Sequence, residues 1–143
     1  MHLAYNYFPK DFNELRNLLT KLLKERGKDA DLNDIDISKV STFYNENTDI
    51  GLFEKLNPHN IDIKYWDVSN VEYMAGTFYK CKNFNSDLSK WNVRKVKNMG
   101  YMFFDCPKFN CNLDKWDVSN VEYWRGMFDG CTSLKNKPSW YKK

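Results

Sequence analysis

The chain has 143 residues, of which 42% are hydrophobic and 17% aromatic, and its net charge is +3. This length suits one domain, and so mild a charge does not by itself argue for a nucleic-acid partner. No stretch approaches the roughly 20 apolar residues of a membrane span. The N-terminus, MHLAYNYFPK, lacks the charged start and apolar run of a secretion signal. The sequence therefore predicts a folded, cytoplasmic protein.

The N-terminal segment, residues 1–34, is predicted to form a cap around one amphipathic helix at about 11–26. Asp11 followed three residues later by Glu14 is typical of a capping box, and Gly27 is a typical C-terminal stop. One apolar stripe runs along this helix: Phe12, Leu15, Leu18, Leu19, Leu22 and Leu23. We expect the stripe to cover the apolar edge of the following repeats. The alternative is a helix that docks on a partner.

An acidic run, DADLNDID, follows at residues 29–36. Oxygen ligands at alternate positions resemble part of a calcium loop, but the glycine turn and terminal bidentate Glu of such a loop are missing. We therefore expect solvated turns here and no metal.

A period of 25 residues governs residues 35–137. The columns include Trp66, Trp91 and Trp116; Val71, Val96 and Val121; Phe78, Phe103 and Phe128; and Cys81, Cys106 and Cys131. The copies span 35–63, 64–88, 89–113 and 114–137, with a tail at 138–143. The first copy is degenerate and carries six additional residues between Val40 and Phe53, which predicts a bulge. An aromatic of the tail is expected to fold over the last copy.

Each copy is predicted to contain a short strand, a short helix and a turn. Trp91 and Val93, two apart, are typical of a strand. The steps of three, four and three from Val71 to Cys81 place apolar residues on one face of two helical turns. One such unit cannot bury its apolar face alone. The sequence therefore predicts an α/β solenoid, a leucine-rich-repeat-like stack of about four copies.

The repeat pattern, W-(D/N)-V-x-x-V-x-x-M-x-x-x-F-x-x-C-x-x-F-N, covers residues 35–137. It resembles the BspA-like, Mycoplasma-lipoprotein-type family of bacterial leucine-rich repeats. The resemblance implies a leucine-rich-repeat solenoid used for binding, often at cell surfaces. The few copies and the absence of a visible signal peptide or anchor depart from the surface members of that family.

No catalytic constellation is apparent. The sequence contains no Ser/His/Asp set, paired-carboxylate signature or Gly-rich phosphate loop. The cysteine column could suggest a metal ladder, but the only imidazoles, His2 and His59, do not fall near it. Buried, apolar cysteines are the simpler interpretation. We expect no enzyme activity, no cofactor and no metal.

Candidate binding residues are those that depart from the repeat. The middle copy has three basic residues where its neighbours have Ser, Asn and Glu, and the last copy gains a Trp-Arg pair. Aromatic residues off the apolar columns add a second group, with lateral packing between copies as the alternative. Tyr, Trp and Arg are the residues that most often anchor interfaces. The candidates are Arg94, Lys95, Lys97, Tyr73, Tyr79, Tyr101, Phe104, Tyr123, Trp124 and Arg125.

These features predict a non-catalytic protein-binding module. Its small size suggests one specific form, a phage or mobile-element inhibitor of a host defence complex, similar to an anti-CRISPR protein. Nucleic-acid or nucleoprotein binding through the basic patch, with bases stacking on Tyr or Trp, is the first alternative. An adhesin-like surface repeat fragment is the second. The sequence leaves the oligomeric state open.

Overall fold

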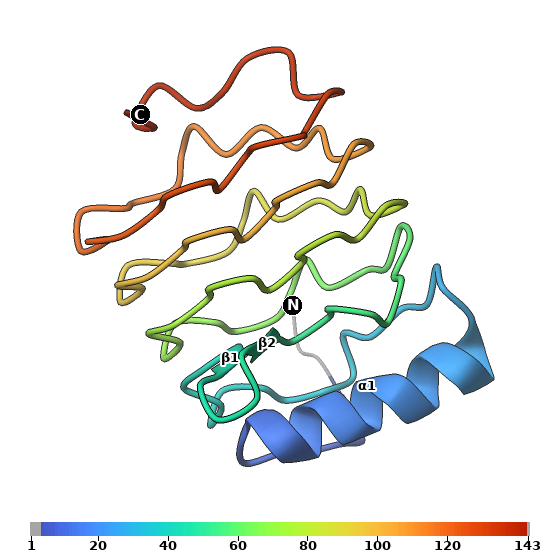
Figure 1. The fold of residues 1–143 in the computed structure, drawn as a ribbon. Coiled ribbons are helices and arrows are strands. Elements are labelled where there is room, and N and C mark those ends of the chain that lie inside the picture. The colour runs from blue at the N-terminus through green and yellow to red at the C-terminus, as the bar shows by residue number, and fades with distance from the viewer. Residues whose placement is uncertain (1–3, 143) are drawn as a thin grey trace.

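The computed structural model of the protein describes residues 4–142, which contain one helix, α1 (Phe12–Arg26), and two short strands. The strands β1 (Tyr44–Asn45) and β2 (Ile50–Gly51) pair antiparallel. The rest of the described chain winds in irregular turns, one copy over another, with α1 beneath the first (Figure 1). Met1, His2 and Lys143, which entered the predictions above, lie outside the described residues.

The predicted α/β solenoid of alternating strands and helices is wrong. Within residues 4–142, the copies contain no helix, and the only strands are β1 and β2 in the degenerate first copy. The strand expected at Trp91 to Val93 is absent, and Trp91 instead ends a tight turn in which its N–H donates to the Leu88 carbonyl at 3.1 Å. The apolar residues do recur every 25 positions, but they lie on irregular turns rather than on strands and helices.

Left-handed residues explain why no helix forms in the copies. In each of the last three copies, two residues four positions apart have positive φ: Gly76 and Lys80, Tyr101 and Asp105, Gly126 and Gly130. A left-handed residue ends an α-helix. The steps of three and four therefore close separate tight turns, such as the one in which Thr77 N–H donates to the Met74 carbonyl at 3.2 Å.

Backbone hydrogen bonds between consecutive copies replace the missing elements. We call residues 35–63, 64–88, 89–113 and 114–137 layers 1 to 4. One column of single parallel bridges joins all four, through Thr42, Tyr73, Asn98 and Tyr123. Farther along, Phe78 N–H donates to the Met102 carbonyl at 2.9 Å. The equivalent bond between the next two layers joins Phe103 N–H to the Met127 carbonyl at 3.0 Å. Buried backbone groups are thus paired between layers.

Tryptophan repeats in the core because each indole N–H has a fixed carbonyl partner 27 to 34 residues earlier in the chain. Trp66 donates to the Leu32 carbonyl, and Trp116 to the Leu88 carbonyl, both at 2.9 Å. The phenylalanine column stacks beside them, with ring centroids of Phe78 and Phe103 5.6 Å apart at 6°. These columns form one continuous core through all the layers.

The cysteine column is buried, as the sequence predicted. The Cys106 and Cys131 thiols donate to the carbonyls of Phe78 and Phe103, both at 2.9 Å. Burial raises the pKa of Cys106 to about 12 and that of Cys131 to about 11, so both stay neutral donors at physiological pH.

The helix expected at the N-terminus is present and begins as predicted. Asp11 accepts the Glu14 N–H at 2.9 Å, and Gly27 follows the last turn at φ 95°. The Glu14 side chain returns to the Lys10 N–H rather than to that of Asp11, so the reciprocal half of the capping box is displaced by one residue.

Aromatic residues close the opposite end, as expected of the tail. Trp140 stacks on Trp116 with centroids 6.4 Å apart at 7°, and Tyr141 meets Phe128 edge-on at 5.1 Å. The bulge predicted in the first copy is also confirmed, because its additional residues form the β1–β2 hairpin.

Candidate functional site: a tyrosine groove

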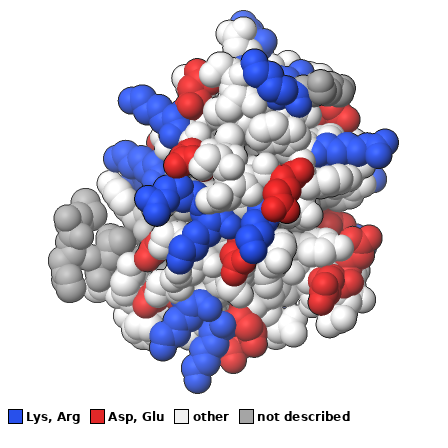
Figure 2. All heavy atoms as spheres, turned by 90° about the vertical axis from the view of Figure 1, so that its left-hand side faces the viewer, with Lys and Arg blue, Asp and Glu red and all other residues white. Residues whose placement is uncertain are grey.

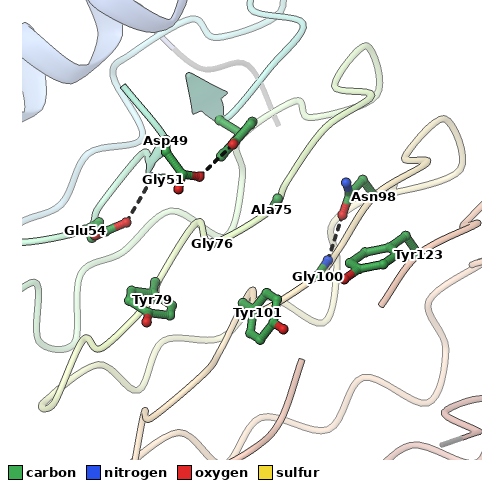
Figure 3. Close-up of a pocket in the computed structure, with 11 residues that line it drawn as sticks. Asp49, Gly51, Glu54, Ala75, Gly76, Tyr79, Asn98, Gly100, Tyr101 and Tyr123 are labelled. Atoms are coloured by element: carbon green, nitrogen blue, oxygen red, sulfur yellow. Dashed lines mark hydrogen bonds between the residues drawn. The ribbon is translucent and has the colours of Figure 1, made fainter. Parts of the chain in front are cut away.

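A pocket of about 550 Å³ opens where the β1–β2 hairpin meets the turns of layers 2 and 3 (Figure 3). Its lining combines four tyrosines and two carboxylates with small residues and one amide. We call it the tyrosine groove: Tyr44, Tyr79, Tyr101, Tyr123, Asp49, Glu54, Gly51, Gly76, Gly100, Ala75 and Asn98. Three predicted binding residues meet here, contributed by layers 2, 3 and 4.

Tyr101 has an unusual backbone. Its φ is 55°, in the left-handed region, and the equivalent residues of the neighbouring layers are Gly76 and Gly126. That conformation costs a side-chain-bearing residue about 1–2 kcal/mol. A tyrosine here is therefore not what backbone geometry favours.

Two glycines leave room for the rings of Tyr101 and Tyr123. A Cβ built on Gly126 would lie 2.6 Å from Cε1 of Tyr101, and one built on Gly100 would lie 2.5 Å from Cε1 of Tyr123. Each ring therefore lies against a glycine of an adjacent layer. The exposed fractions are 36% for Tyr101 and 44% for Tyr123, so the rings rest on the backbone while remaining open to solvent.

Phe104 supports the groove from the side. Its ring stacks on Tyr79 with centroids 5.2 Å apart at 14°, and meets Tyr101 edge-on at 5.8 Å. Phe104 and Tyr79 are only half-exposed, so the lateral-packing alternative holds for this pair. Tyr101 and Tyr123 are the rings that face outward.

The carboxylates come from the hairpin and the turn after it. The Tyr44 hydroxyl donates to Asp49 Oδ1 at 2.7 Å, which raises the pKa of Tyr44. Glu54 Oε1 accepts the Gly51 N–H at 3.2 Å. The groove lining contains no Lys, Arg or His. This part of the surface is therefore acidic and aromatic.

A second hollow, of about 650 Å³, adjoins the groove and shares Tyr44 and Asn98 with it. Its lining includes Tyr73, with an exposed fraction of 44%, and reaches Asp11 at the start of α1. We call the two adjoining hollows together the depression.

The predicted basic residues are not part of the lining of this depression. Lys97 Nζ is 3.1 Å from Glu72 Oε1, and this contact raises the pKa of Lys97. Lys95 donates to Asn70 Oδ1 at 3.2 Å, and Arg94 is exposed. None of the three lines either hollow. The face shown in Figure 2 likewise mixes Lys and Arg with Asp and Glu, with neither charge covering it alone.

Trp124 and Arg125, the Trp-Arg pair of the last copy, have different environments. Trp124 is half-buried and stacks on Trp140 with centroids 5.7 Å apart, so it belongs to the closing end of the core. Arg125 is exposed, and its carbonyl accepts the Tyr101 N–H at 2.9 Å. Its backbone therefore contacts a groove residue, and its side chain is not part of the groove lining.

Eight of the eleven groove residues were not predicted, and among them Tyr44, Asp49 and Glu54 contribute the remaining tyrosine and the two carboxylates. The sequence contained one clue, because the six additional residues of the first copy depart from the repeat just where Tyr44 and Asp49 lie. What it could not show is the turn of the hairpin toward layers 2 and 3.

No group of three or more His, Cys, Asp or Glu side chains in residues 4–142 is arranged to hold a metal ion. The acidic run at 29–36 instead makes local contacts, among them the ion pair of Asp34 with Arg26 at 2.9 Å. No helix in the described part of the chain has the length and apolar content needed to cross a bilayer.

Residues 46–142 match the family described as "Mycoplasma protein of unknown function, DUF285". The chain belongs to this family. The match includes layers 2 to 4 and the part of layer 1 that carries Asp49 and Glu54. It confirms the resemblance to Mycoplasma-type repeat proteins, and it assigns no leucine-rich repeat to this DUF285 protein. No curated protein and no solved structure matched the chain.

Proposed function

We propose that this DUF285 protein is a non-catalytic binding module that holds an extended segment of a protein partner in the tyrosine groove. One observation carries the proposal. Four large apolar side chains are exposed in residues 4–142, and three of them, Tyr73, Tyr101 and Tyr123, line the groove or the adjoining hollow; Phe8 is the fourth. Exposed aromatic surface gathered in one depression is typical of a binding site.

The adjoining positions of the two hollows support an extended occupant. The groove and the adjoining hollow share Tyr44 and Asn98, so one segment could contact both. Tyrosine presents a large contact area at low conformational cost. The strained backbone of Tyr101 also favours a functional role, because strain persists where something other than local stability selects the residue.

The resemblance to BspA-like proteins implies binding and agrees with this proposal. The finer predictions made from the sequence, a cytoplasmic location and an inhibitor carried by a phage or mobile element, remain hypotheses. Genes neighbouring this one would bear on them, since cell-wall genes beside it would favour the adhesin-like alternative.

Tyr101→Gly is the sharpest test, because its effects on binding and on stability are expected to differ. Glycine occupies the equivalent position in both neighbouring layers, so the change relieves backbone strain of about 1–2 kcal/mol and offsets the lost ring contacts. We expect a melting temperature within a few degrees of the parent. We also expect the amount of protein partner retained by the immobilised chain to fall at least about tenfold, as is typical when an aromatic anchor is removed.

The control is Tyr65→Gly, which removes a tyrosine that lies outside both hollows. Retention equal to the parent by Tyr101→Gly would contradict the proposal. A second variant addresses the basic patch: Arg94→Glu with Lys97→Glu should leave retention unchanged. If that variant alone abolishes retention, and the retained material is nucleic acid released by salt, the nucleic-acid alternative replaces ours.

A further inference from the structure

We propose that the tyrosine groove recognises a positively charged side chain, lysine or arginine, carried by the extended segment of the partner. This inference rests on the proposed function and specifies the chemistry of the occupant. It follows from the distribution of charge, the arrangement of the rings and the behaviour of the chain's own lysines.

The depression is acidic although the chain as a whole is basic. The groove contributes Asp49 and Glu54, and the adjoining hollow contributes Asp11 and Glu46; neither lining includes Lys, Arg or His. The net charge of the chain is +3. A local potential opposite to the overall charge favours a cationic group at this place over an anionic one.

Carboxylates and rings enclose the same space. In Figure 3, Asp49 and Glu54 lie on one side of Gly76, and Tyr79 and Tyr101 lie on the other. An aromatic face attracts a cation, and a carboxylate completes its neutralisation. Because Gly76 has no side chain, the stem of a lysine can approach the backbone between them.

The chain's own lysines already make this kind of contact. Lys80 Nζ is 5.3 Å from the centroid of the Tyr79 ring, and Nζ of Lys64 and Lys90 are 5.5 and 5.6 Å from that of Tyr65. Lys80 therefore competes for Tyr79 with any incoming cation. Tyr101 remains the ring that a partner can reach first, since it is the more exposed of the two.

Asp49 carries the larger share of the negative charge offered to a ligand. Arg16 lies near Glu54 and offsets part of that charge, while its guanidinium is held by the carbonyls of Gly51 and Leu52 at 3.2 and 2.8 Å. Asp49 is exposed at the hairpin, and its φ is 56°. Asparagine tolerates that conformation, so Asp49→Asn removes the charge without disturbing the backbone.

The test is a titration of the full chain with three seven-residue Gly-Ser peptides that carry a central lysine, norleucine or glutamate. Binding is followed by NMR at the backbone amides of Gly51, Gly76 and Gly100, which line the groove. We expect saturable shifts with the lysine peptide. The norleucine and glutamate peptides should bind at least about tenfold more weakly, as expected for loss of a charge-assisted contact.

Three variants sharpen the result. Asp49→Asn should weaken lysine-peptide binding about tenfold, and Glu25→Gln, an exposed carboxylate on α1, should leave it unchanged. Lys80→Asn should strengthen binding severalfold, because it removes the competing ammonium and Asn suits the φ of 57° at that position. A purely structural role for these residues would not produce opposite signs.

Norleucine binding as tight as lysine, no shift of the groove amides with any peptide, or an Asp49→Asn variant with unchanged affinity would each overturn the cationic inference. The outcome of the retention experiment with Tyr101→Gly does not depend on any of these results. That experiment alone decides whether the groove is the binding site.

Discussion

At the residue scale, each repeated tryptophan has a polar atom with a fixed partner on an earlier segment of the chain. The indole N–H groups of Trp66, Trp91, Trp116 and Trp140 each donate to a carbonyl at 2.9 Å. Phenylalanine could fill the volume of a tryptophan in part, but it would leave that buried carbonyl unpaired, which is costly. The repeat is thus maintained by hydrogen bonds as well as by apolar packing.

Phe103 is the residue whose loss should weaken the core most clearly. It is fully buried between Phe78, Phe109 and Phe128. Phe103→Ala should lower the free energy of unfolding by about 3–5 kcal/mol, because the surrounding rings cannot close the cavity. Chemical denaturation measures it. The half-buried neighbour Phe104 is the control, and an equal loss in Phe104→Ala would contradict the assignment of Phe103 to the core.

At the scale of the elements, α1 and the hairpin act together. The Arg16 guanidinium reaches from the helix to the carbonyls of Gly51 and Leu52, at β2 and just beyond it. Gly51 leaves no room for a side chain, because a Cβ there would run into the backbone of Gly76. The Arg16 hydrogen bonds attach the helix to the hairpin, and the close approach of Gly51 to Gly76 attaches the hairpin to layer 2. The hairpin in turn places Asp49 at the groove.

Arg16→Met should loosen this connection. The change keeps an unbranched stem but removes two charge-assisted hydrogen bonds, so we expect a loss of about 1.5–3 kcal/mol in the free energy of unfolding. Lys21→Met, on the exposed part of α1, should stay within about 0.5 kcal/mol of the parent. Thermal and chemical unfolding of the two variants measure the difference. Equal stability of both would show that Arg16 does not secure the helix.

At the scale of the whole molecule, layers contact one another through side chains 25 residues apart. Outside the core, aspartates in the polar turns accept hydrogen bonds from nearby residues. The Ser89 hydroxyl and N–H lower the pKa of Asp87, and those of Ser119 lower the pKa of Asp117. Arg26 lowers the pKa of Asp34 through a hydrogen bond. These depressed pKa values tie the stability of the molecule to pH.

We expect acid to destabilise the protein. A carboxyl group whose folded pKa lies below its unfolded value of about 3.9 contributes stability that is present above that value and lost as pH falls through the folded pKa. The melting temperature should therefore hold between about pH 8 and 5 and decline below about 4. Asp34→Asn should melt lower at neutral pH and decline less steeply in acid. An identical acid profile for parent and variant would contradict this account of Asp34.

Much of the core could be predicted from the sequence, because burial follows composition and spacing. The Trp, Phe and Cys columns, the helix after Asp11 and the aromatic cover at Trp140 all follow from local rules of periodicity and capping. The backbone could not be predicted in the same way. Steps of three and four fit a helix and a series of tight turns equally well, and only the left-handed residues distinguish them.

The groove shows where sequence reasoning ends for this protein. The sequence by itself determined which residues lie inside and which aromatics depart from the repeat, since both are properties of a position in a period. Only the tertiary structure brought Tyr44 and Asp49 of the hairpin to Tyr101 and Tyr123 of other layers. The physical reason is that those distances depend on the path of the turns and on contacts between residues far apart in the chain, such as the Tyr101 ring on Gly126.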